Sequence, residues 1–114
     1  MFIRLAILAF AMTMIASVSA TEPAVAKITV LASGQLLLNG KPSDMNAVDA
    51  ALSELKTKKG EVWYHRQNPQ SEPHPNAMAV IQLVMKHHLP ISMSSKPDFS
   101  DYVDRDGRSR PRRP

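Results

Sequence analysis

The stretch from Ile28 to Pro42 constrains the fold of this chain more than any other. Two runs rich in β-forming residues, Ile28–Leu31 and Gln35–Leu38, flank Ser33-Gly34, a pair that tolerates the positive φ of a tight turn. We therefore predict a β-hairpin. A second turn ends at Pro42, and because proline has no N–H to donate to a ladder, we expect the chain to leave the sheet there and continue into a helix.

Two amphipathic helices are predicted after the hairpin. The first spans Asp44–Lys59, with Ser43 as its N-cap and Gly60 as its C′ residue. The second spans Asn76–His88 behind Pro75, a residue that the first helical turn accepts. Its apolar stripe is wide, which indicates deep burial. The positions expected to face the core are Met45, Val48, Leu52 and Leu55 in the first helix, and Ala77, Ile81, Val84 and His88 in the second, with Met78 and Met85 beside them.

A strand is predicted on each side of the second helix. Glu61–Arg66 is rich in β-branched and aromatic residues, and Ile91–Ser94 follows a proline that ends the helix. A strand, a crossover helix and a second strand form a right-handed unit, so the two strands should be parallel neighbours. The predicted fold class is α+β: a small mixed β-sheet, made of the N-terminal hairpin and a βαβ unit, with two helices packed on one face.

The strand Glu61–Arg66 also carries the candidate partner-binding residues Trp63, Tyr64 and His65. Val62 and Tyr64 face one side of the strand, and Trp63 and His65 face the other. A strand that is buried on one face and partly open on the other leaves either pair available for a partner. The alternative is that the aromatic side chains simply pack across helix seams.

Residues 1–20 have the organisation of a secretory signal peptide. Arg4 precedes an apolar run, and the small residues Ser17, Ser19 and Ala20 suit a cleavage site. An uncleaved membrane anchor is the alternative, because the run is only slightly shorter than the ~20 residues that a spanning helix needs. Either way the domain is predicted to be exported. The chain has no cysteine, which excludes disulfides, thiolate metal sites and a lipoprotein anchor.

Charge divides the rest of the chain into residues 21–103, predicted to be one folded domain, and a tail, 104–114. The domain has eight Lys plus Arg against eight Asp plus Glu, whereas the tail has five Arg against two Asp. Because the tail has almost nothing apolar to bury, we predict that it is disordered. The segment 95–104 is either one helical turn or an extended arm. Candidate residues for binding an anionic surface are Arg105, Arg108, Arg110, Arg112 and Arg113.

No catalytic motif is visible, and we predict neither an enzyme nor a cofactor. The sequence lacks a nucleophile elbow, a P-loop, a dinucleotide fingerprint and an HExxH motif. His65, His74, His87 and His88 are the candidate metal ligands or acid/base groups. The adjacent pair His87 and His88 would point about 100° apart on a helix, so it cannot form the i, i+4 pair that grips zinc. Solvated or helix-end histidines are the simpler interpretation.

The order and spacing of these elements resemble the periplasmic domain of the ExbD/TolR family of biopolymer-transport proteins. The resemblance covers Lys27–Pro97. The residues that carry it are Gly34, Leu38-Asn39-Gly40-Lys41-Pro42, Val62-Trp63-Tyr64, Pro75–His88 and Lys96-Pro97.

The resemblance implies a partner-binding module that works with a proton-driven motor in the inner membrane. Family members carry an acidic residue in one membrane helix, whereas Met1–Ala20 has no Asp or Glu to relay a proton. Our hypothesis is an exported binding module that takes part in biopolymer and transmembrane transport without its own proton relay. It would be periplasmic, or anchored in the inner membrane and facing the periplasm.

The predicted partner is an envelope protein, for example of a TonB/Tol-type motor complex. An extended peptide would add as a strand to an open edge of the Ile28–Leu38 hairpin, and the same edge would pair two copies in a homodimer. The alternative function is an envelope-surface binder whose Arg-rich tail holds anionic lipid or cell-wall polymer. Nucleic acid fits those arginines on charge alone, but an exported protein rarely meets it.

Overall fold

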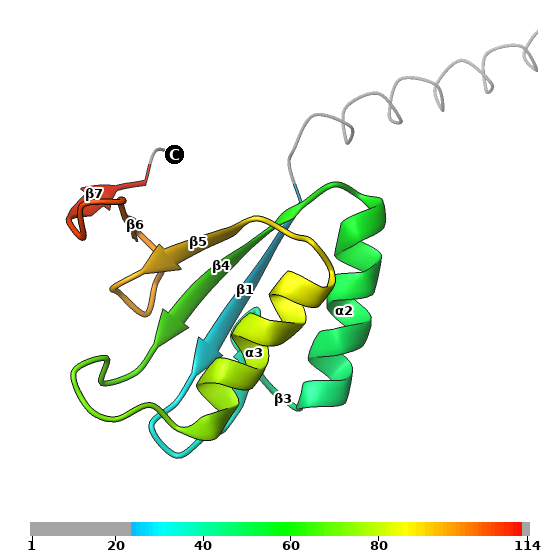
Figure 1. Cartoon of the computed structure of the whole chain (residues 1–114), viewed down its shortest axis with the longest axis horizontal. Coiled ribbons are helices and arrows are strands. Elements are labelled where there is room, and N and C mark those ends of the chain that lie inside the picture. Colours follow the sequence, from blue (N-terminus) through cyan, green and yellow to red (C-terminus); the bar gives the residue numbers. More distant parts are fainter. Residues whose placement is uncertain (1–23, 113–114) are drawn as a thin grey trace, which may run out of the picture.

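The computed structural model describes residues 24–112, and the predicted signal peptide lies outside them. These residues form a five-stranded mixed sheet with two helices on one of its faces, and a separate two-stranded sheet (Figure 1). The α+β fold class is therefore confirmed. Within residues 24–112, neither helix combines the length and the apolar character that a membrane crossing requires.

The large sheet has the strand order β3-β2-β1-β4-β5. β1 pairs antiparallel with β2 and parallel with β4, and β4 pairs parallel with β5. The predicted hairpin and the predicted parallel βαβ unit are both confirmed, and β1 joins them. The strands are β1 (Val25–Val30), β2 (Leu36–Leu38), β3 (Lys41–Ser43), β4 (Glu61–Arg66) and β5 (Ile91–Ser94).

The prediction that the chain leaves the sheet at Pro42 is wrong. Pro42 lies in β3, opposite Leu37 of β2. β3 is the outermost strand of the sheet, and an edge strand tolerates proline because one row of its backbone groups has no ladder partner. The turn before it is as expected: Asn39 and Gly40 both have positive φ, at 53° and 85°.

In the first helix, α2 (Met45–Thr57), the N-cap and the C′ residue each lie one residue away from the predicted positions. Its N-cap is Asp44, whose carboxylate accepts a hydrogen bond from the Ala47 N–H at 2.8 Å. Ser43 does not cap the helix because it is the last residue of β3. At the other end Lys59, not Gly60, takes the left-handed conformation, with φ 55°. Gly60 has a different reason to be glycine, since a Cβ there would collide with Leu55 and the Ala24 carbonyl.

The second helix, α3 (Pro75–Lys86), is less deeply buried than the wide apolar stripe predicted. Its buried residues are Ala77, Val80 and Val84, whereas Met78 is 58% exposed and Met85 is 66% exposed. His88 lies past the helix end and is also exposed. The prediction fails because the sheet and α2 cover only one face of α3.

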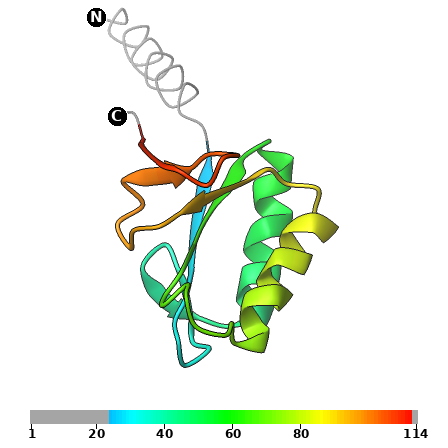
Figure 2. The same ribbon diagram turned by 60° about the vertical axis from the view of Figure 1, so that its left-hand side comes forward.

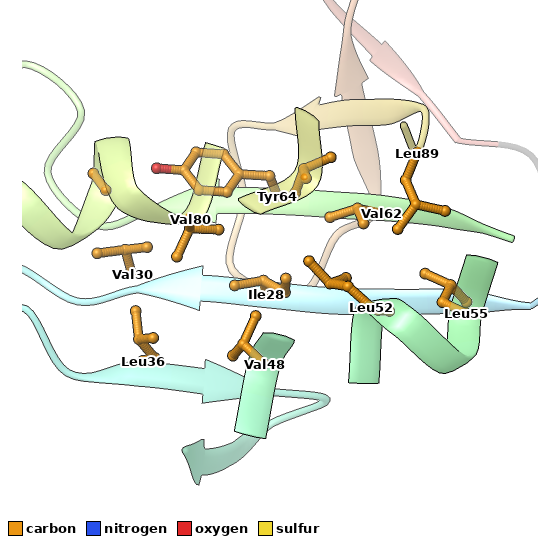
Figure 3. Close-up of a cluster of buried hydrophobic side chains, with 13 residues drawn as sticks. Ile28, Val30, Leu36, Val48, Leu52, Leu55, Val62, Tyr64, Val80 and Leu89 are labelled. Carbon is orange, nitrogen blue, oxygen red and sulfur yellow. The ribbon is translucent and has the colours of Figure 1, made fainter. Parts of the chain in front are cut away.

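The core lies between the sheet and the two helices. Figure 3 shows Ile28 of β1 and Val62 of β4 on the same side of the sheet as Val48 and Leu52 of α2. All four side chains are fully buried. The three apolar positions Val48, Leu52 and Leu55 of the predicted α2 stripe are confirmed as core, and Met45 packs against its margin.

The C-terminal segment is folded, so the prediction of a disordered tail is wrong for residues 104–112. The strands β6 (Asp101–Val103) and β7 (Ser109–Pro111) form an antiparallel hairpin. Its turn is held by Asp104, whose carboxylate accepts from the backbone N–H groups of Asp106 and Arg108. Figure 2 shows this hairpin on the side of the large sheet that faces away from the helices. Contacts with the sheet replace the apolar core that the segment lacks.

We predict that Leu52→Ala lowers the free energy of unfolding by about 2–5 kcal/mol, because it leaves a cavity in the core. Met78→Ala on the exposed side of α3 should change it by less than about 0.5 kcal/mol. Urea unfolding followed by circular dichroism measures both. Equal costs for the two variants would contradict the assigned helix faces.

Candidate functional site

The outer edge of β5 is one candidate binding surface. In the part of the chain that the structure describes, β5 pairs only with β4 and ends the sheet on that side. The hairpin edge that we predicted as the docking edge is instead covered, since β2 pairs with β3 and β1 with β4. The sheet therefore ends in β3 on one side and in β5 on the other. β3 carries Pro42, which has no N–H to donate, so β5 is the better template for an added strand.

An apolar hollow lies beside this edge, between β5 and α3. It has a volume of about 200 Å³, and its walls come from β4, α3, β5 and the loop before α3. Met78 and Met93 are both exposed here, at 58% and 41% of their surface. The lining residues are Tyr64, Arg66, Pro73, Ala77, Met78, Ile81 and Met93.

A second hollow of about 240 Å³ continues from the first around Met93. The two share Tyr64, Arg66 and Met93, and the second extends to Ser95 and to Val103 of β6. Among the described residues that line the two hollows, Arg66 alone is charged. Its guanidinium donates to the carbonyls of Ser71 at 3.1 Å and Pro69 at 2.5 Å, which ties the loop before α3 to the rim. We call the two hollows together the β5 groove.

The three predicted partner-binding residues do not form one site. Tyr64 lies on the helix side and lines the β5 groove. Burial raises the pKa of its phenol, and the nearby charge of Arg66 opposes this shift. Trp63 and His65 lie on the opposite face of β4, where the C-terminal segment covers them. The predicted alternation of side chains along β4 is confirmed. One face of the strand meets the helices and the other meets the C-terminal segment.

His65 is buried and has no hydrogen bond at Nδ1. Its ring meets the ring of Phe99 edge-on, with 6.2 Å between the centroids. Burial lowers the pKa of His65, and the negative charge of Asp101 opposes this effect. The imidazole, which packs edge-on against the Phe99 ring, is part of the join between β4 and the C-terminal segment.

Asp101 is the polar centre of that join. It is only 2% exposed. Its carboxylate accepts from the hydroxyls of Ser94 at 2.7 Å, Ser95 at 2.5 Å and Ser109 at 2.6 Å, and from the Ser95 N–H at 3.0 Å. Burial is the largest influence and raises the pKa of Asp101. The hydrogen bonds from Ser109, Ser95 and Ser94 together outweigh it and leave the pKa below its ordinary value.

The predicted anionic-surface arginines are not equivalent. Arg105, Arg108 and Arg110 are exposed on the C-terminal hairpin, and Arg110 forms an ion pair of 2.8 Å with Asp104. Arg112 is partly buried and is bound within the protein. Arg113 lies outside the described residues.

Two of the remaining histidines, His74 and His87, make hydrogen bonds that hold structural elements together. His74 is the N-cap of α3, and its Nδ1 accepts from the Asn76 N–H. His87 bonds to the Asp49 carboxylate at 2.6 Å and so joins the two helices; this bond, supported by the charge of Lys86, lowers the pKa of Asp49. Among residues 24–112 no group of three or more His, Cys, Asp or Glu side chains is placed to hold a metal ion.

Two features of the site escaped prediction from the sequence. The β5 groove depends on methionines that a helical stripe assigns to the core, and only their position on the outer side of α3 makes them exposed. The join around Asp101 had a weak signal, the pair Ser94-Ser95 followed by an acidic residue, but nothing indicated which hydroxyls would meet it. No protein-family model matches this chain, and no curated protein matches it either.

Acid should weaken the C-terminal join, and Asp101→Asn should remove that sensitivity. The pKa of Asp101 is lower in the folded protein than in the unfolded chain, where it is about 3.9. The ionised carboxylate therefore stabilises the fold above that pH, and the stabilisation is lost as pH falls below it. Urea unfolding at several pH values from about 6 to about 3 should show a smaller loss for Asp101→Asn than for the wild type.

Asp106→Asn is the matched control, because Asp106 is an exposed carboxylate in the same hairpin. It should keep the wild-type dependence on pH. The same slope for Asp101→Asn and the wild type would mean that Asp101 does not stabilise the join through its charge.

Proposed function

We propose that this protein is an ExbD/TolR-like binding module of the cell envelope that binds an extended segment of a partner protein along β5. The observation that carries the proposal is the open outer edge of β5, which runs beside the exposed β5 groove. The module would take part in biopolymer and transmembrane transport at the envelope. Its partner would be a protein of a TonB/Tol-type motor complex.

Backbone groups of β5 would supply the affinity for such a segment. The Val62 N–H donates to the Pro90 carbonyl, which fixes the register between β4 and β5. Because backbone groups alternate along a strand, those of Ile91 and Met93 point away from β4 and toward the open edge. An added strand would pair with these groups whatever its own side chains are.

Side chains in the β5 groove would supply the specificity. An incoming strand places alternate side chains on the helix side, next to Met93 and the outer face of α3. Methionine adapts its shape to different apolar partners, and Met78 and Met93 are both exposed there. The positive charge of Arg66 in the lining favours an acidic residue beside the apolar one. The expected ligand is therefore an extended segment with an apolar and an acidic side chain.

The fold is compatible with the family resemblance, since the hairpin, the first helix and the βαβ unit follow one another as that resemblance requires. The motor activity is a separate matter. Residues 1–20 carry no Asp or Glu, so the proposed module would depend on other subunits for proton transfer.

Binding of an anionic surface through the Arg-rich tail is less well supported by the geometry. Arg112 is engaged within the protein, and Arg110 is paired with Asp104. Of the tail residues that the structure describes, the other exposed arginines are Arg105 and Arg108, which flank Asp106 in the same turn. This arrangement offers little concentrated positive charge to a membrane or a cell-wall polymer.

Peptide mapping tests the proposal. Overlapping synthetic peptides from the periplasmic regions of the host's TonB- and Tol-type proteins are added to the isotope-labelled protein, and amide chemical shifts are recorded. A binding peptide should shift the amides of Ile91–Ser94 and of Tyr64, because these lie at the edge and in the groove. Met93→Glu should weaken binding by about tenfold or more, since it places a charge in an apolar site.

Met85→Glu is the matched control, because Met85 is an exposed methionine on α3 that does not line the groove. It should bind like the wild type. Shifts confined to the C-terminal hairpin, or equal loss in both variants, would contradict binding at β5. A change in mass on dilution without added peptide would identify a second copy as the occupant.

A further inference from the structure

We propose that the sheet face opposite the helices carries an arginine-binding site, and that Arg112 of the same chain occupies it. This inference concerns the other side of the sheet and does not rest on the function proposed above. The site would accept the guanidinium group of a partner's arginine when Arg112 leaves. Its walls come from β4, β5 and the segment that leads into β6.

Each of the three guanidinium nitrogens of Arg112 has an acceptor. Nε donates to the Phe99 carbonyl at 3.1 Å, and Nη2 donates to the Asp101 carbonyl at 2.8 Å. Nη1 donates to the Ser92 hydroxyl at 3.1 Å. All three nitrogens are therefore bonded, in the planar arrangement that only a guanidinium can satisfy.

Two aromatic rings complete the site. The central carbon of the guanidinium lies 3.9 Å from the centroid of the Trp63 ring, which is a stacking distance. The Tyr102 ring is 5.8 Å away. Arg112 is thus bound by backbone carbonyls, a hydroxyl and aromatic faces, a combination that recognises the guanidinium group by shape as well as by charge.

The walls of this site are held by contacts that do not involve the Arg112 side chain. The Asp101 carboxylate binds Ser94 and Ser95, which fixes the segment that presents the two carbonyls. The indole Nε1–H of Trp63 donates to Glu61 at 2.6 Å, which fixes the ring. Because these bonds remain when the side chain at 112 is shortened, we expect an empty but formed receptor in such a variant.

The occupant can be exchanged because it lies at the end of the C-terminal hairpin. The backbone of Arg112 makes one hydrogen bond there, from its N–H to the Ser100 carbonyl at 2.9 Å. Its side chain supplies most of the remaining attachment. A peptide arginine at sufficient concentration therefore competes with Arg112 for the site. The apparent affinity of the peptide is its affinity for the empty site multiplied by the fraction of molecules in which Arg112 has left.

Chemical rescue of Arg112→Ala tests the inference. Trp63 is the only tryptophan, so its fluorescence reports on the ring against which Arg112 stacks. Loss of the stacked guanidinium should shift the Trp63 emission to longer wavelength, as the ring becomes more exposed. Methylguanidinium, added below its denaturing concentration, should reverse this shift saturably. A synthetic peptide with the sequence of residues 108–114 should do the same at lower concentration.

Three controls make the result specific. Methylammonium carries the same charge without the planar donors and should not restore the emission. Arg110→Ala removes an exposed arginine of the same hairpin and should leave Trp63 emission at the wild-type position. In the wild type, methylguanidinium should have a much smaller effect, because Arg112 already fills the site.

The inference is overturned if the folded Arg112→Ala variant shows no response to methylguanidinium, or if methylammonium restores the emission equally well. If circular dichroism shows that Arg112→Ala is unfolded, Arg112→Lys takes its place. The lysine keeps a positive charge but leaves acceptors without donors, so methylguanidinium should displace it and move the emission toward the wild-type value. An unchanged emission in that folded variant would also exclude the site.

Discussion

The parallel pairing of β1 with β4 is the contact on which the rest of this structure depends. It joins all six residues of each strand, from Val25 opposite Glu61 to Val30 opposite Arg66. A parallel pair needs a crossover connection, and right-handed crossovers from β1 to β4 and from β4 to β5 place α2 and α3 on the same face. One face of the sheet becomes the core, and the other is left for different partners.

That second face explains why the C-terminal segment folds. β4 has bulky residues on both sides, so Trp63 and His65 need cover as much as Val62 and Tyr64 do. The helices cover only the latter pair. The C-terminal segment covers the former with the aromatic ring of Phe99 and with the polar groups of Asp101 and Arg112, which are hydrogen-bonded within the protein.

The sequence predicted correctly those elements that are determined by residues close together in the chain. The Ser33-Gly34 turn, the helix start near Asp44 and the βαβ order could all be inferred from neighbouring residues. The failures arose where a distant segment decides the outcome. Pro42 stays in the sheet because it lies in an edge strand paired with β2. Residues 104–112 are ordered because β7 pairs with β6 and because Ser109 and Arg112 contact Asp101 and Trp63. The candidate site was predictable only in part, since alternation separated Tyr64 from Trp63 and His65 but could not show what covers each face.

β5 connects the two surfaces for which we propose ligands. Met93 lines the groove on the helix side, and its neighbour Ser92 accepts a hydrogen bond from Arg112 on the opposite side. The segment that follows β5 leads directly to Asp101 and the two carbonyls that bind the guanidinium. An added strand would give β5 a second ladder partner. Departure of Arg112 would remove the hydrogen bond that it donates to Ser92 of β5. Binding on one face therefore acts on the same four residues that form part of the site on the other.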